Sequence, residues 1–175
     1  MRLAIAACLF IAGGVIEHVR HKAEEAREYA DANQGLLVAM VKSHGEPADG
    51  ADAQPVSDVT EARRVRDELS SRLSHQPPLP DLNSLGWSLK TAAVRPLQGA
   101  VAARITFAHG DRHATLFSLP RFALTGATDG HTYDLIVDGH PISGYVTADG
   151  VHCIVGDAAT PLADITALRK HLQQL

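Results

Sequence analysis

The second half of the chain consists of short segments in which apolar and polar residues alternate, separated by residues typical of tight turns. Residues 100–108 and 113–119 show this alternation most clearly, and the connection between them contains Gly110 and Asp111. Alternation with a period of two is typical of a β-strand that buries one face, and a short glycine-containing connection favours a hairpin. The pattern therefore predicts an antiparallel strand pair in this part of the chain.

Two Asp-Gly pairs, at 138–139 and 149–150, predict further hairpins. This dipeptide readily adopts the positive φ angles of a type I′ turn, which makes it a strong short-range hairpin signal. Three apolar stretches flank the two pairs: residues 133–137, 141–147 and 151–155. Shorter apolar stretches precede the first hairpin, at 85–89 and 91–94. We expect these segments to join one small antiparallel sheet.

A C-terminal helix is predicted after the last strand. Thr160 is a suitable N-cap, and Pro161 suits the first helical position because its fixed φ angle matches the helix. Four residues at helical spacing form an apolar face: Leu162, Ile165, Leu168 and Leu172. Residues 79–175 are therefore expected to be an α+β domain, in which this helix packs on one face of the sheet.

Residues 21–78 predict a helical stalk with a loop at 45–57. Residues 17–43 carry apolar residues at spacings of three and four, which indicates one helix, continuous or with a short break. The loop is acidic and contains two prolines. Asp58 and Glu61 have the spacing of a capping box, so a second helix is predicted from 58 to about 75, before the Pro-rich turn.

The N-terminus carries an uncharged run of fourteen residues from Leu3 to Ile16. The run is shorter than the roughly 20 residues that span a bilayer as a helix. It fits the apolar core of a secretory signal, but no small-x-small cleavage site follows it. A lipid anchor at Cys8 and a buried helix are further alternatives. We favour an uncleaved membrane anchor at residues 1–20, in an inner-membrane, single-pass protein whose main domain is periplasmic.

Composition excludes some partners. The formal net charge is −4 and aromatic residues make up 5% of the chain, with Trp87 the only tryptophan, so neither a phosphate-binding surface nor a base-stacking platform is indicated. We therefore expect no nucleic-acid partner. The two cysteines, Cys8 in the apolar run and Cys153 near the far end, should lie in different environments, so no internal disulfide is expected.

Ten histidines raise the alternative of a periplasmic metal-binding sensor. A metal site needs three or four converging ligands, and the candidate ligands are His109, His113, His131 and His140. His152 and Cys153 are consecutive in a predicted strand, so their side chains should face opposite sides of the sheet. The usual paired zinc-ligand motifs are absent from the sequence, and the favoured interpretation is that no metal or other cofactor is bound.

Motifs of catalysis are also absent. No Gly-x-Ser-x-Gly elbow surrounds any serine, and the glycines at 126 and 130 lie between predicted strands instead of before a helix that could bind phosphate. The sequence therefore favours a protein that is not an enzyme.

One segment resembles a known family. Pro80-Asp81-Leu82, followed by Gly86-Trp87 and then Leu89, is similar to the entry of the extracytoplasmic domain in bacterial transmembrane anti-sigma factors. Further matches are Pro96, Gly99, Ala102, Ala103, Gly150, Val151, Ile154, Val155, Gly156 and Asp157. The resemblance covers residues 60–175 and implies an extracytoplasmic sensor-like domain that regulates transcription through signal transduction across the membrane.

The resemblance also implies protein partners. In that family a cytoplasmic N-terminal segment binds a sigma factor, and this sequence has no counterpart before Met1, so a sigma factor is an expected partner only if such a segment is missing here. We otherwise expect a partner in the membrane or periplasm, or a homodimer through the stalk helix. The candidate interaction residues are Leu36, Leu37, Val41, Val59, Leu69 and Leu73.

Overall fold

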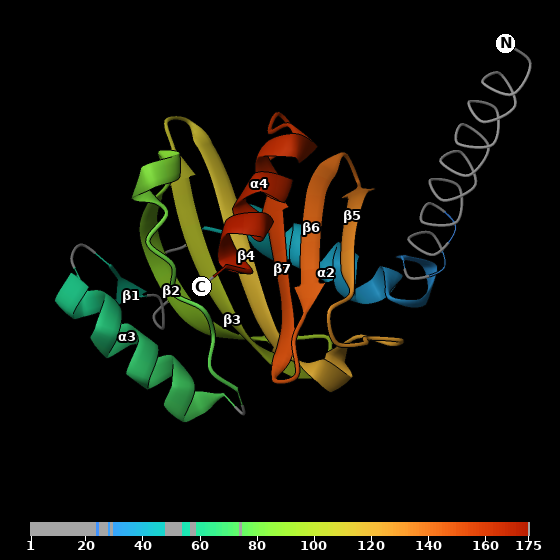
Figure 1. Cartoon of the computed structure of the whole chain (residues 1–175), viewed down its shortest axis with the longest axis horizontal. Helices are drawn as coiled ribbons and strands as arrows, with labels where there is room; N and C mark the ends of the chain where they lie inside the picture. The colour runs from blue at the N-terminus through green and yellow to red at the C-terminus, as the bar shows by residue number, and fades with distance from the viewer. Residues whose placement is uncertain are drawn as a thin grey trace, which may run out of the picture.

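The computed structural model describes residues 24, 28, 30–47, 54–56, 59–73 and 75–174, and the fold is α+β (Figure 1). Its centre is a seven-stranded antiparallel sheet in the order β1-β2-β3-β4-β7-β6-β5. The strands are β1 (Gln54–Pro55), β2 (Ser88–Leu97), β3 (Ala100–His109), β4 (Arg112–Pro120), β5 (Thr132–Val137), β6 (His140–Val146) and β7 (Gly150–Gly156). The antiparallel sheet and the C-terminal helix confirm the α+β part of the predicted fold.

The predicted hairpins are confirmed. The β3–β4 connection is Gly110–Asp111, with His109 paired to Arg112. At the β5–β6 turn Asp138 and Gly139 both have positive φ, 49° and 80°, as a type I′ turn requires. A further hairpin was not predicted: β2 is one strand of ten residues that turns into β3 through Gln98 and Gly99, whose φ angles are 49° and 82°.

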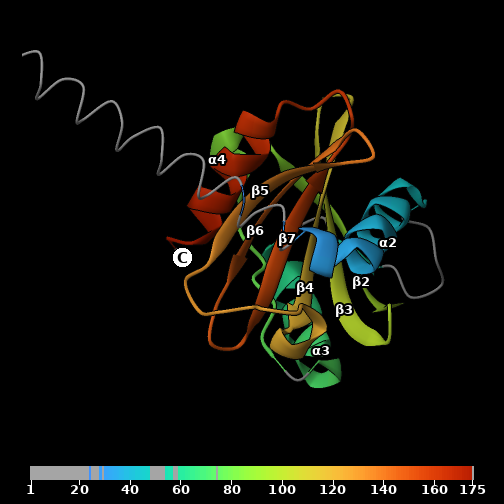
Figure 2. The ribbon, with the colours of Figure 1, turned by 90° about the vertical axis from the view of Figure 1, so that its right-hand side faces the viewer.

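Helices cover both faces of the sheet. Helix α4 (Leu162–Leu172) and helix α3 (Val59–Arg72) pack on one face, which we call the α4 face, whereas α2 (Gln34–Gly45) packs on the opposite α2 face. Figure 2 shows α4 and α2 on opposite sides of the strands. The C-terminal helix packs on one face as predicted, and α2, which was expected to belong to a stalk, covers the other. Accordingly β7 is buried along its whole length and has apolar side chains on both faces.

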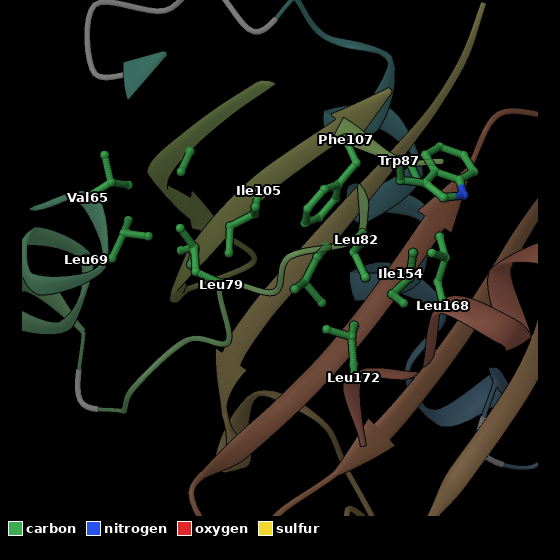
Figure 3. Packing of buried hydrophobic residues seen from close by; sticks show 14 of the residues in the cluster. Val65, Leu69, Leu79, Leu82, Trp87, Ile105, Phe107, Ile154, Leu168 and Leu172 are labelled. Atoms are coloured by element: carbon green, nitrogen blue, oxygen red, sulfur yellow. The ribbon is translucent and has the colours of Figure 1, made fainter. Parts of the chain in front are cut away.

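The core of the α4 face joins elements that lie far apart in the sequence. Val65 and Leu69 of α3 reach it from one side, and Leu168 and Leu172 of α4 from the other (Figure 3). Between them the segment 75–87 crosses the sheet. We call this segment the strap; its buried apolar residues include Leu79, Leu82 and Trp87.

The predicted stalk is part of the same folded unit. Leu36, Leu37 and Met40 of α2 are buried against the sheet, and the helical stretch before them is interrupted by a turn at Asn33. The apolar residues of α2 that were candidates for partner binding are therefore used within the chain. Helix α3 begins at Val59 and ends at Arg72, and the Asp58 of the predicted capping box lies outside the described residues.

The apolar face predicted for α4 is confirmed, but its cap is not. Ile165, Leu168 and Leu172 are buried, and Leu162 is partly buried. Pro161 occupies the N-cap position, one residue later than predicted, and no side chain caps the helix there. The Thr160 hydroxyl is buried and has no hydrogen-bond partner in the described part of the chain.

The predicted membrane anchor at residues 1–20 lies outside the described residues. Within the ranges that are described, no helix combines the length and the apolar character needed to cross a membrane.

Candidate functional site

The most distinctive polar groups of the domain are buried where peripheral segments meet the sheet. On the α2 face, His44 from the last turn of α2 inserts between Thr115 of β4 and Asp157, the residue after β7. Its Nε2 lies 3.0 Å from Asp157 Oδ1 and its Nδ1 lies 2.9 Å from Thr115 Oγ1. A carboxylate only accepts hydrogen bonds, so Nε2 donates to Asp157 and Nδ1 accepts from the Thr115 hydroxyl.

The surroundings of His44 disfavour its protonated form. Burial lowers its pKa below 6.5, and this effect outweighs Asp157, which raises the pKa. The nearby His140 and Arg104 lower it further. His44 is therefore held as a neutral ring. Asp157 is shared, because it also accepts a short hydrogen bond from the backbone N–H of His113.

The C-terminus of α2 receives a second buried contact from Arg104 of β3. The Arg104 Nη2 donates to the carbonyl of Glu46 at 2.7 Å and to that of His44 at 3.4 Å. The last carbonyls of a helix lack partners within the helix and carry partial negative charge, so a buried guanidinium satisfies both needs.

The other end of α2 is fixed by Asn33. Its amide donates to the carbonyl of Thr125 at 3.1 Å and accepts from the N–H of Thr125 at 2.7 Å. This reciprocal pair imitates a pair of sheet hydrogen bonds. We call the contacts at the two ends of α2 the α2 clamps. One clamp is Asn33 with Thr125, and the other consists of His44 and Arg104 with their partners.

A second cluster lies on the α4 face. Ser118 Oγ lies 2.8 Å from His75 Nε2 and 3.1 Å from His152 Nδ1, so two histidines share one hydroxyl. Burial lowers the pKa of both rings, that of His152 to about 4. His75 comes from the strap, whereas Ser118 and His152 face each other on β4 and β7. We call these three residues the strap latch.

Both clusters contain groups used in acyl transfer, but their hydroxyls are closed off. Asp157, His44 and Thr115 follow the order acid, base, hydroxyl that activates a nucleophile. A nucleophile must reach its substrate, but Thr115 and Ser118 are both 0% exposed. In this conformation the two clusters therefore hold structural elements together.

The four histidines proposed as metal ligands are not brought together. His109 lies against Trp87 on the α4 face, and its Nδ1 accepts from Arg112 at 2.6 Å. Arg112 pairs with His109, so both side chains lie on the α4 face. His113 is the next residue of β4, and its side chain therefore lies on the α2 face. His131 and His140 lie at opposite ends of the β5–β6 hairpin, about 20 Å apart. No group of three or more potential ligands occurs in the described ranges.

The candidate interaction residues mostly belong to the core. Leu36, Leu37 and Leu69 are buried. Val41 and Leu73 are partly buried against the same clusters. The side chain of Val59 lies outside the described residues. The five residues with described side chains therefore stabilise the domain instead of forming a free surface.

The sequence did not predict that the residues of the α2 clamps and the strap latch come together. Arg104 and His152 each lie within a mostly apolar, buried strand, which is a signal of a buried polar contact. The prediction that His152 and Cys153 face opposite sides is confirmed, because Cys153 lies on the α2 face within 2.6 Å of the Tyr133 hydroxyl. The partners of these residues lie far away in the sequence, so local patterns do not reveal them.

Comparison of the chain with protein-family models, curated proteins and solved structures gave no match.

Proposed function

We propose that this chain is a regulatory protein tethered to the inner membrane through its N-terminal apolar segment, with its α+β domain in the periplasm. In this proposal the domain senses a condition or binds a protein partner, and α2 passes the change toward the membrane. The observation that carries the proposal is the docking of α2, which is clamped to the sheet by polar contacts at both ends.

The clamps make the position of α2 depend on the state of the sheet. Apolar contacts alone tolerate small shifts, whereas buried hydrogen bonds lose their strength when donor and acceptor move apart. The clamp partners are spread over β3, β4, the end of β7 and the segment after β4. A change in the packing of any of these elements therefore acts on the helix that follows the apolar segment.

Three residues on which the resemblance to transmembrane anti-sigma factors is based have packing roles in the domain. Gly86 has φ 78° and lets His109 lie directly over it, since a Cβ there would be 3.0 Å from His109 Nε2. Trp87 packs against the same ring. Gly156 lets Ile165 of α4 approach the sheet, because a Cβ would lie 2.7 Å from its Cδ1. These residues act through close packing, and we base the proposed sensing role on the resemblance and on the docking of α2.

Membrane topology is the first test. The full chain is fused at Leu175 to alkaline phosphatase, which is active only outside the cytoplasm, or to β-galactosidase, which is active only inside. We expect phosphatase activity, no galactosidase activity, and recovery of the chain with the inner membrane. Galactosidase activity in a soluble cytosolic fraction would contradict the proposal.

The regulatory role is tested in the native host. Transcript levels are compared between the wild type, a strain that lacks the gene, and the deletion strain supplied with either the natural chain or the Asn33→Ala variant. We expect a defined set of transcripts to change on deletion, to be restored by the natural chain, and to be restored poorly by the variant. An unchanged transcript profile on deletion counts against regulation.

A further inference from the structure

The strap is held on the sheet mainly by side chains. It contains Pro77, Pro78 and Pro80, which have no N–H to donate, so a regular ladder with the sheet is not possible there. The Arg66 guanidinium donates to the Leu79 carbonyl at 3.0 Å, and Leu79 and Leu82 enter the core. At the start of the strap the polar anchor is His75, whose Nε2 contacts Ser118.

Hydrogen bonds around Thr147 fix the protons of the latch. The Thr147 hydroxyl donates to the Gly150 carbonyl at 3.2 Å and lies 3.4 Å from His152 Nε2. When the Thr147 hydroxyl donates to Gly150, Nε2 of His152 is the donor to Thr147. The Nδ1 of neutral His152 then accepts from the Ser118 hydroxyl, and Ser118 Oγ accepts from His75 Nε2.

This series of hydrogen bonds is complete only when both histidine rings are neutral. A proton on His152 Nδ1 would leave the Ser118 hydroxyl without an acceptor and would place two N–H groups against one oxygen. A proton on His75 would go to Nδ1, which is buried and has no hydrogen-bond partner in the described part of the chain. The rings are 6.4 Å apart between centroids, so two charges would also repel each other.

The surroundings offset this cost only in part. Burial is the main cause of the lowered pKa of both rings, and His75 lowers that of His152 further. A hydrogen bond with the Ser118 backbone and, more weakly, the Asp149 carboxylate in the β6–β7 turn raise the pKa of His75, but burial outweighs both. Tyr145 of β6 lies 4.8 Å from the His152 ring, and burial raises its pKa to about 12, so it stays neutral.

Protonation should displace His75 and leave His152 in place. His152 is paired with Ser118 on one side and with Tyr145 on the other, in the middle of the sheet. His75 lies outside the strands and rests on Gly150, where a Cβ would be 3.2 Å from its Cδ2. The low-energy response to a charge is therefore for the His75 ring to swing into water and take the start of the strap with it.

We propose that His75, Ser118 and His152 form a proton-sensitive latch that holds the strap on the α4 face at neutral pH and releases it in acid. Release uncovers the apolar sites of Leu79 and Leu82 without breaking the sheet. The inference adds acidification as a stimulus of the proposed sensing domain. This biological role rests on the proposed function, whereas the latch itself does not.

Hydrogen–deuterium exchange on the purified full chain tests the latch. Exchange is followed by mass spectrometry at pH 7.5 and 4.5 and corrected for the intrinsic rate at each pH. We expect the amides of Leu85 and Trp87, which donate to the Leu82 carbonyl within the strap, to lose protection about tenfold at pH 4.5 and to exchange faster than the amides of β4 and β7. Unchanged protection of Leu85 and Trp87, or their exchange together with β4 and β7 at pH 4.5, would overturn the inference.

Two variants assign the effect to the latch. His75→Gln places a non-titrating amide near the position of Nε2, and His152→Asn places one near Nδ1. We expect each variant to reduce the difference between pH 7.5 and 4.5, and we expect the control His113→Gln, whose ring is largely exposed, to retain it. Full wild-type pH dependence in both latch variants would refute the assignment, including when either variant is less stable at both pH values.

The outcome is separable from that of the topology experiment. Exchange is measured on the isolated chain and does not depend on where the chain resides in the cell. A negative result removes the latch and leaves the proposed regulatory role, whereas cytosolic localisation removes the role and leaves the latch.

Discussion

Removing the Asn33 side chain tests how strongly α2 is clamped. In Asn33→Ala the N–H and the carbonyl of Thr125 lose their partners, which lie at 2.7 and 3.1 Å in the natural chain. Asn33 is 5% exposed, so water replaces the lost contacts only partly. A buried group left without its partner costs about 1–3 kcal/mol, and for two partly buried groups we expect a loss of about 2–4 kcal/mol in the free energy of unfolding.

Asn33→Asp makes the prediction sharper through its pH dependence. An ionised carboxylate accepts from the Thr125 N–H but repels the Thr125 carbonyl, whereas a protonated carboxyl group restores both hydrogen bonds. The folded state therefore raises the pKa of this carboxyl group. Stability from the contact is present below the carboxyl pKa of the unfolded chain and is lost as pH rises through the higher folded value. The deficit relative to the natural chain should shrink from pH 7 to pH 4.

The assay is urea unfolding followed through the fluorescence of Trp87, which is the only tryptophan and is buried in the folded chain. The control is Asn83→Ala, an exposed position where we expect a change within about 0.5 kcal/mol. A loss below about 0.5 kcal/mol in Asn33→Ala, or an Asn33→Asp deficit that does not change with pH, would refute the clamp as a stabilising contact.

Three further predictions concern the buried sheet. Gly144→Ala should destabilise the chain by about 2–4 kcal/mol in urea unfolding, because the new Cβ would lie 2.6 Å from Cε2 of Tyr133, and an unchanged midpoint would contradict this packing. Burial lowers the pKa of His152 from 6.5 to about 4, so its contribution to stability is present above pH 6.5 and is lost as pH falls toward 4. Going from pH 7.5 to 4.5 should cost about 2–3 kcal/mol through this ring, and His152→Asn should show a smaller pH dependence of unfolding. Burial raises the pKa of Cys153 to about 12, so an alkylating reagent at pH 8 should modify the Cys153 peptide only after unfolding, as mass spectrometry can show; rapid modification of the folded chain would refute the burial.

The β5–β6–β7 region was predicted well because its turns and strands are encoded by residues that are adjacent in the sequence. Asp138 and Gly139 form the turn, and the strands on either side match the predicted stretches within a residue or two. The β2–β3 hairpin was harder to predict. Gln98 precedes Gly99 in its turn, and glutamine is not a typical residue at positive φ, so the pair carried a weaker signal than Asp-Gly.

The docking of the helices was not predictable in the same way. Leu37 and Met40 of α2 show an apolar face, but a face that packs on the same chain looks identical in sequence to one that meets a partner. The contact of His44 with Asp157 joins residues 113 positions apart. Such contacts are decided by which elements the sheet brings together, so the candidate site emerged from the structure and not from motifs.

The positions of the buried polar groups suggest how the domain can change shape without unfolding. The centre of the sheet relies on apolar side chains such as Phe107 and Phe117, which are nearly inaccessible to water and insensitive to pH. The peripheral elements rely on polar contacts as well: α2 on Asn33 and His44, and the strap on His75. Polar contacts depend on protonation and on competing partners, whereas burial of apolar area does not. A change of conditions should therefore loosen α2 or the strap while the strands stay paired, which is the property that a sensing domain needs.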